Sequence, residues 1–238
     1  IPNEDGGNQN YEAITFLKHL NSIVAQRNPG AMMIAEESTA WPKVTGDVDD
    51  GGLGFTYKWN MGWMHDFLEY MKCDPIFRKY HQNQITFSFM YAYSENYVLV
   101  LSHDEVVHLK KSMIYKMPGT MPEKFGNLRA AYGLMMMHPG KKLLFMGQDF
   151  AQTAEWNEAK SLDWHLLEKY PEHQQLNHYY CDLLHFYQNE PALYELDDSP
   201  EGFAWINGSD AEHNMLTFCR MTKDKKNCLL CHFNFSPV

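Results

Sequence analysis

The chain has 238 residues, 45% of them hydrophobic, and a formal net charge of −10 at pH 7. This length and composition fit one large globular domain, or one domain with part of a second. The acidic balance disfavours nucleic acid and anionic membrane surfaces as partners, because both select a basic face. No apolar run in the sequence is long enough to span a bilayer.

The cysteine pattern indicates reduced thiols. The five cysteines are an odd number, and Cys228-x-x-Cys231 has no second pair that would complete a four-ligand zinc site. We therefore expect a cytoplasmic protein with no structural disulfides. Asp47, Asp49 and Asp50 do not have the spacing of a calcium loop and are expected to be solvated. No other ligand set for a metal is evident, and we expect no cofactor. The start at Ile1, without an initiator Met, suggests a piece of something larger.

Apolar spacing gives the expected order of elements. Apolar residues at three- and four-residue steps predict helices over about 10–27, 61–72, 85–93, 122–137 and 176–188. Short apolar runs predict strands at 32–35, 55–59, 97–101 and 143–146, and loops are expected at 109–122 and 152–162. Strands that alternate with helices in this way indicate an α/β fold built as part of a (β/α) barrel.

The pattern changes after Pro191. Short alternating runs at 203–206, 215–221 and 228–235 predict antiparallel strands. We therefore place a domain boundary near residue 198, with part of the barrel in 1–198 and the beginning of an all-β domain in 199–238.

Polar side chains follow the apolar runs at the points where α/β folds gather their chemistry. Glu36-Glu37-Ser38 follows the run 31–35, and Ser102-His103-Asp104-Glu105 follows the run 97–101. Two strand–helix units of about 30 residues each fit between these clusters. The alternative is an acidic surface turn. From composition alone, Glu36 and Asp104 could also be the acid and base of an inverting hydrolase.

Several motifs together resemble one family. They are Ala35-Glu36-Glu37-Ser38-Thr39, Lys58-Trp59-Asn60-Met61-Gly62-Trp63, Leu101-Ser102-His103-Asp104-Glu105-Val106-Val107-His108, Phe145-Met146-Gly147-Gln148-Asp149-Phe150 and Ser161-Leu162-Asp163-Trp164. In this order, over nearly the whole chain, they resemble the bacterial 1,4-α-glucan (glycogen) branching enzymes of the α-amylase superfamily. The resemblance implies an eight-stranded barrel, of which this chain supplies about strands five to eight, and then the first part of a C-terminal β-sandwich.

The resemblance also implies roles for individual residues. Glu36 matches the general acid/base of the family, Asp104 the carboxylate that stabilises the transition state, and His103 an imidazole that holds sugar hydroxyls. Trp59 and Gln148 are candidate substrate contacts, although core packing is the simpler expectation for Trp59. The family's nucleophilic aspartate ends the fourth strand, ahead of residue 1. We therefore expect the isolated chain to be inactive.

The implied chemistry is cleavage of an α-1,4-glucan and transfer of the chain to a 6-hydroxyl. Retaining glycoside chemistry uses a nucleophilic and a protonated carboxyl group about 5–5.5 Å apart. The alternatives are a non-catalytic glucan-binding or assembly fragment and an α-glucan hydrolase of the same superfamily. The family has Gly at the position of Leu109, and residues 152–157 keep only part of its pattern, which bears on acceptor binding.

An incomplete barrel leaves two sheet edges, which we expect at strands 32–35 and 143–146. Both predicted runs are almost wholly apolar, without a protecting charge. We therefore expect the chain to self-associate, or to remain bound to a missing N-terminal half.

Overall fold

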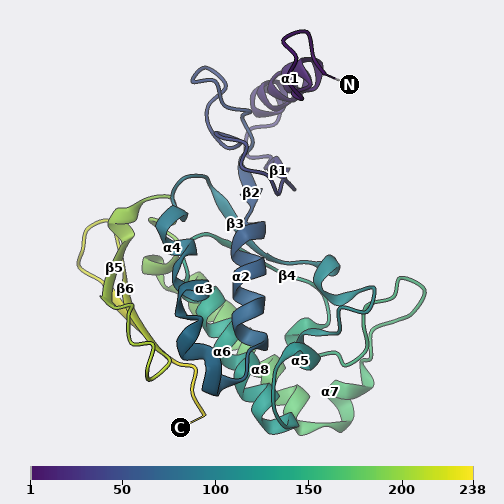
Figure 1. Ribbon diagram of the computed structural model, residues 1–238, viewed down its shortest axis with the longest axis vertical. Helices are drawn as coiled ribbons and strands as arrows, with labels where there is room; N and C mark the ends of the chain where they lie inside the picture. The colour runs from purple at the N-terminus through teal and green to yellow at the C-terminus, as the bar shows by residue number, and fades with distance from the viewer. Residues whose placement is uncertain (1, 238) are drawn as a thin grey trace.

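The computed structural model describes residues 2–237 and contains two β-sheets together with helices (Figure 1). The α-helices are α1 (Tyr11–Arg27), α2 (Met61–Lys72), α3 (Gln82–Thr86), α4 (Ser88–Tyr91), α5 (Met113–Lys116), α6 (Met121–Met137), α7 (His165–Lys169) and α8 (Pro171–Asn189). The strands are β1 (Ile34–Ala35), β2 (Tyr57–Trp59), β3 (Tyr97–Leu101), β4 (Lys141–Leu144), β5 (Phe203–Asn207), β6 (Met215–Met221) and β7 (Cys228–Asn234). Figure 1 shows β5 and β6 at one side of the molecule. Short 3-10 helices are η1 (Pro75–Tyr80), η2 (His103–Val106), η3 (Gln148–Phe150), η4 (Pro191–Leu193) and η5 (Pro200–Gly202).

The first sheet is parallel and has the order β1-β2-β3-β4. All four strands therefore end at the same edge of the sheet. Val98, Leu99, Val100 and Leu101 of β3 are buried, as expected for a strand covered on both faces. The predicted alternation of parallel strands and helices is confirmed.

Local sequence signals fix several helices. Asn10 caps α1 through its side chain, and Asn60 caps α2 by accepting a hydrogen bond from the Trp63 N–H at 2.8 Å. Thr120 and Glu123 form a reciprocal capping box at the start of α6. The methionines at the end of α6 are buried in the main core, so they serve packing, as do Trp63 and Phe67 of α2.

The second sheet is antiparallel, with the order β5-β6-β7. Its inner face carries Phe218, Leu216 and Cys231, which belong to the same core as α6 and α8. Gly133 of α6 lies where a Cβ would be 3.0 Å from the Tyr179 hydroxyl, so this glycine allows close approach of α6 and α8. The predicted change from an α/β to an all-β pattern is therefore present in the fold.

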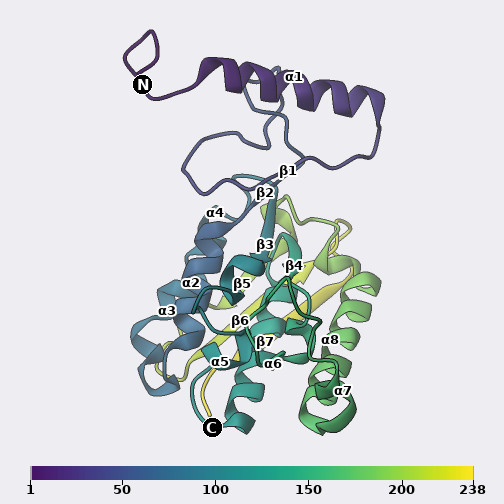
Figure 2. The same cartoon turned by 90° about the vertical axis from the view of Figure 1, so that its right-hand side faces the viewer.

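Residues 10–55, with α1 and β1, project away from the helices and the antiparallel sheet (Figures 1 and 2). They have a small core of their own, formed by Ala35, Val44 and Leu53. Within residues 2–237, no strand pairs with the outer side of β1, and Met32 and Ile34 there are 64% and 45% exposed. The predicted apolar edge at β1 is thus confirmed.

Other predicted bounds were wrong. The strand predicted at 143–146 is β4, which begins two residues earlier and includes Lys141 and Lys142. This edge therefore carries charge, contrary to expectation. The strand predicted at 32–35 is shorter, because only Ile34–Ala35 pairs with β2. The expected loop 109–122 contains α5.

The start of the last long helix, α8, also differs from the prediction. Helix α8 begins at Pro171 instead of near residue 176, and α7 precedes it. Proline is favoured in the first turn of a helix, where its missing N–H leaves no hydrogen bond unmade. The helical spacing of 85–93 is confirmed, although it is divided between α3 and α4.

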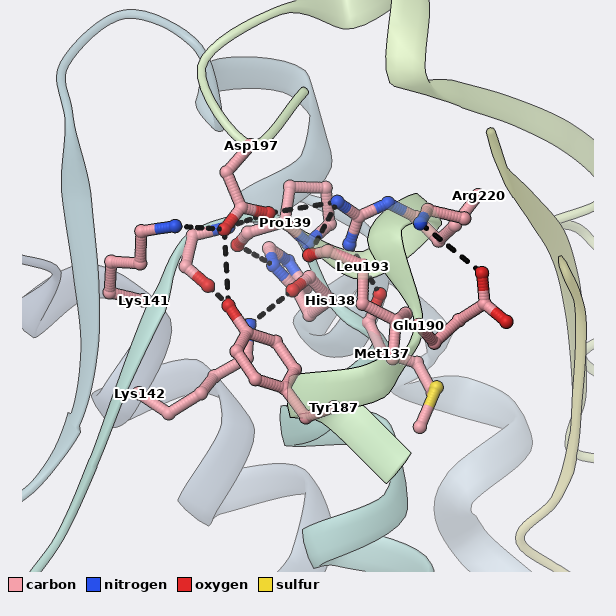
Figure 3. Close-up of polar contacts among 12 residues, drawn as sticks. Met137, His138, Pro139, Lys141, Lys142, Tyr187, Glu190, Leu193, Asp197 and Arg220 are labelled. Carbon is pink, nitrogen blue, oxygen red and sulfur yellow. Dashed lines mark hydrogen bonds and ion pairs between the residues drawn. The ribbon is translucent and has the colours of Figure 1, made fainter. Parts of the chain in front are cut away.

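A buried ionic network joins the two sheets (Figure 3). Asp197, which follows η4, contacts Arg220 of β6 at 2.8 Å and Lys141 of β4 at 2.9 Å. The Tyr187 hydroxyl donates to the same carboxylate at 3.2 Å. Arg220, which is fully buried, also donates to the carbonyl oxygens of Met137 and Leu193. Asp197 therefore ties together β4, α8 and the antiparallel sheet.

Candidate functional site

The first polar cluster follows the end of β1. Glu36 is exposed and comes directly after the buried Ala35. The neighbouring Glu37 forms an ion pair with Lys58 of β2 at 2.7 Å, and the Thr39 N–H donates to Glu37 at 2.7 Å. Burial acts to raise the pKa of Glu37, but the hydrogen bonds from Lys58 and Thr39 outweigh it and hold the pKa below its ordinary value. Glu37 is therefore a structural partner of Lys58.

Lys58 is a residue of this site that the sequence analysis missed. It is 6% exposed, and its ammonium group also donates to the Thr39 carbonyl at 3.0 Å. These two contacts fasten the segment after β1, which carries Glu36, to the neighbouring strand. A lysine inside the otherwise apolar and aromatic run 55–59 was the available signal.

The second cluster is a 3-10 turn at the end of β3. Glu105 accepts hydrogen bonds from the Ser102 N–H at 2.5 Å and from the Ser102 hydroxyl at 2.9 Å. This capping box closes η2 and presents His103 and Asp104 on the outside of the turn. Their side chains are 45% and 44% exposed, and His103 Nε2 lies 3.2 Å from Asp104 Oδ1. Both groups can therefore reach a ligand.

Two aromatic side chains flank the imidazole. The His103 ring lies 5.9 Å from the ring of Phe145 and 6.0 Å from the ring of Trp156. Phe145 and Trp156 contact each other edge to face at 5.1 Å. The backbone N–H of Trp156 donates to the Val106 carbonyl at 3.0 Å, and this bond holds the loop that carries Trp156 against η2. Sequence analysis did not connect Trp156 with His103, because their contact depends on loop packing.

The two carboxylates share one edge of the parallel sheet. Glu36 follows β1 and Asp104 follows β3, with β2 between them. Trp59, the last residue of β2, is half-buried between the two clusters along this edge. The positions of these three residues agree with the expected arrangement at the C-terminal ends of parallel strands.

Gln148 is placed differently from the other predicted residues. It is completely buried, and its Oε1 accepts a hydrogen bond from the Met113 N–H at 3.1 Å. Its backbone carbonyl accepts from the Tyr132 hydroxyl at 2.7 Å. The Nε2 has no hydrogen-bond partner within residues 2–237. In this structure Gln148 supports α5 from beneath and is not open to solvent.

Within residues 2–237, no group of three or more His, Cys, Asp and Glu side chains could hold a metal ion. The same part of the chain contains no helix that could cross a membrane. The arrangement therefore offers carboxylates, an imidazole and aromatic faces as its chemical groups.

Solved structures give the class of fold. The chain superposes on an α-amylase from H. orenii with a TM-score of 0.62, 14% identity, and coverage of 94% of this chain and 47% of that one. It superposes on a cyclomaltodextrinase with a TM-score of 0.63 and 14% identity, covering 92% of this chain and 34% of that one. At this level of identity the likeness concerns the fold alone, which combines a parallel and an antiparallel sheet.

Sequence relatives are more specific. The chain is 54% identical to a 1,4-alpha-glucan branching enzyme GlgB of Halothermothrix orenii, over 100% of this chain and 38% of the relative. It is 52% identical to GlgB of Rubrobacter xylanophilus and 53% identical to GlgB of Shewanella frigidimarina, covering 33% and 32% of them. No protein-family model matches. The chain thus spans about a third of the length of these relatives, and the predicted resemblance to branching enzymes is confirmed.

Proposed function

We propose that the chain is a section of a longer protein, here called the parent, that branches α-1,4-glucan. The parent cleaves an α-1,4-linked chain and transfers it to a 6-hydroxyl of another chain, as part of glycogen biosynthesis in the cytoplasm. The observation that carries this proposal is the identity of 52–54% to branching enzymes over the whole chain. The section would comprise about strands five to eight of the catalytic barrel in residues 1–198. The beginning of a C-terminal β-sandwich would follow in 199–238.

The proposed catalytic residues are Glu36 and Asp104. Glu36 would protonate the leaving oxygen and later deprotonate the acceptor hydroxyl, while Asp104 would stabilise positive charge on the sugar ring. His103 would hold sugar hydroxyls, and its exposure beside Asp104 supports this role. We retain Trp59 as a stacking contact, because it lies on the edge between the two carboxylates. We do not retain Gln148 as a substrate contact, because its side chain is completely buried.

The proposed mechanism also needs a nucleophilic carboxylate, which we place in the parent outside this chain. The isolated chain should therefore show no branching of amylose, whereas the parent should shorten the long linear segments that bind iodine. The measurement is the loss of iodine absorbance with equal molar amounts of both proteins. Turnover by the pure chain would contradict this assignment of the nucleophile.

We further propose that the parallel sheet needs a partner at its β1 edge. Ile34 of β1 is 45% exposed and Met32, which precedes the strand, is 64% exposed, so an isolated monomer would leave both side chains in contact with water. The isolated chain should self-associate, most simply as a two-fold dimer, or bind the N-terminal half of the barrel. Size-exclusion chromatography with light scattering measures this directly. A monodisperse monomer with a cooperative melting transition would show that the edge needs no cover.

A further inference from the structure

A cavity of about 650 Å³ lies between the outer face of α2 and the segment that leads from η2 to α5. Four lysines line it, namely Lys72 of α2 together with Lys110, Lys111 and Lys116. Figure 1 shows α5 beside the lower part of α2. The volume lies within the range of small-molecule sites in proteins.

The two carboxylates of this cavity already have partners. Glu69 forms an ion pair with Lys72 at 2.8 Å, and Glu105 accepts the two hydrogen bonds from Ser102. Within residues 2–237, Lys110, Lys111 and Lys116 have no carboxylate within ion-pair distance. Three ammonium groups that form no ion pair thus share one cavity with the carboxylates of Glu69 and Glu105.

Lys116 is the most constrained of these lysines. It is 8% exposed, and its ammonium group donates to the Lys110 carbonyl. Burial and repulsion by Lys72 lower the pKa of Lys116 to about 8. A buried ammonium group is costly unless it is paired, so an anion in the cavity would relieve this cost.

The segment that carries Lys110 and Lys111 has a strained backbone. His108, Leu109 and Lys111 have φ angles of 53°, 68° and 67°, in the left-handed region that non-glycine residues seldom adopt. Glu155 stabilises this conformation by accepting hydrogen bonds from the N–H groups of Leu109 at 3.0 Å and Lys111 at 2.6 Å. Such strain, held in place by a specific partner, concentrates at functional sites.

We propose that this cavity binds a phosphate group, most favourably the phosphate monoester of a small sugar. Lys110, Lys111 and Lys116 would supply the positive charge for the phosphate oxygens. Met64 and Leu68 of α2 and the Tyr115 ring provide apolar surface beside them for the rest of the ligand. The cavity adjoins the second polar cluster, because Glu105 of η2 is one of its lining residues, but the inference does not depend on the proposed function.

Isothermal titration calorimetry of the 238-residue chain with inorganic phosphate, glucose 6-phosphate and glucose tests the proposal. We expect saturable binding of both phosphate compounds, tighter for glucose 6-phosphate, with a Kd of about 1 mM or below, and none for glucose. The double variant Lys110→Gln/Lys111→Gln should weaken phosphate binding about tenfold, because each exposed lysine contributes a modest share. Both residues lie on a loop, so the circular dichroism spectrum should not change.

The matched control is the double variant Lys160→Gln/Lys169→Gln, which removes the same charge from two exposed lysines away from the cavity. Its Kd for phosphate should equal that of the unchanged chain. Lys116→Met, checked for folding by circular dichroism, should weaken phosphate binding more than the single variant Lys110→Gln or Lys111→Gln does. Absence of saturable phosphate binding, or equal weakening in the two double variants, would overturn the proposal.

Discussion

Glu36→Gln in the parent should lower the rate of branching by about 10²–10⁴-fold, the usual contribution of a positioned general acid/base. Glutamine keeps the size of the side chain but can neither donate an acidic proton to the leaving oxygen nor take one from the acceptor. Asp104→Asn should lower the rate by about 10²–10³-fold, because it removes a charge that acts on the transition state. The measurement is the initial rate of iodine-absorbance loss on amylose, with the melting temperature recorded for each variant.

A matched control separates catalysis from folding. Glu168→Gln changes an exposed glutamate of α7 in the same way and should leave the rate unaltered. Glu36 is itself exposed, so Glu36→Gln should melt within a few degrees of the unchanged parent. Retention of more than about a tenth of the rate by Glu36→Gln would exclude Glu36 as the acid/base.

Asp197→Asn should destabilise the chain by about 3–5 kcal/mol, the usual cost of removing one partner from a buried ion pair. The change leaves Arg220, which is fully buried, and Lys141 without their counter-ion. Burial acts to raise the pKa of Asp197, but Lys142, Arg220 and Lys141 outweigh it and hold the pKa below its ordinary value. The carboxylate therefore stabilises the folded state at neutral pH.

The pH dependence gives this prediction a second observable. A carboxylate with a lowered pKa contributes stability that is present above its ordinary pKa of about 3.9 and is lost as the pH falls through the folded-state value. The difference between Asp197→Asn and the unchanged chain should therefore be full at pH 7 and shrink below about pH 4. Urea unfolding at several pH values measures it.

The control for this network is an exposed ion pair. Lys79 Nζ lies 3.1 Å from Glu212 Oε2, and the Glu212 side chain is 77% exposed. Glu212→Gln should change the unfolding free energy by at most about 1 kcal/mol. If Asp197→Asn cost no more than Glu212→Gln, the network would not be what joins the two sheets.

Much of the fold followed from residue spacing. Helix α2 and strand β6 have the predicted bounds, because their apolar residues keep one period from end to end. Strand β4 was misplaced because Lys141 and Lys142 look polar in sequence. In the structure the Lys141 ammonium group donates to the distant Asp197 carboxylate. The Lys142 ammonium group donates to the backbone carbonyl of His138 in the loop before the strand. Single-turn helices such as α5 depend on such contacts and carry little periodic signal.

The candidate site was only partly predictable. Glu36 and Asp104 stood out because each follows an apolar run, and parallel strands bring such positions to one edge. Lys58 and Trp156 did not, since their roles arise from contacts with Glu37 and His103 across loops. The left-handed backbone at Leu109 has a signal in the resemblance, because the family has glycine at this position, but the leucine itself gives no sign of a positive φ.

The most direct test of the proposed function is proton NMR of amylose incubated with the parent, following the anomeric signals of α-1,4 and α-1,6 linkages. The account predicts that α-1,6 linkages appear as α-1,4 linkages are lost, in equal numbers and without new reducing ends. Glu36→Gln should suppress both changes. Loss of α-1,4 linkages with a matching rise in reducing ends and no α-1,6 signal would identify a hydrolase and contradict the proposed transfer.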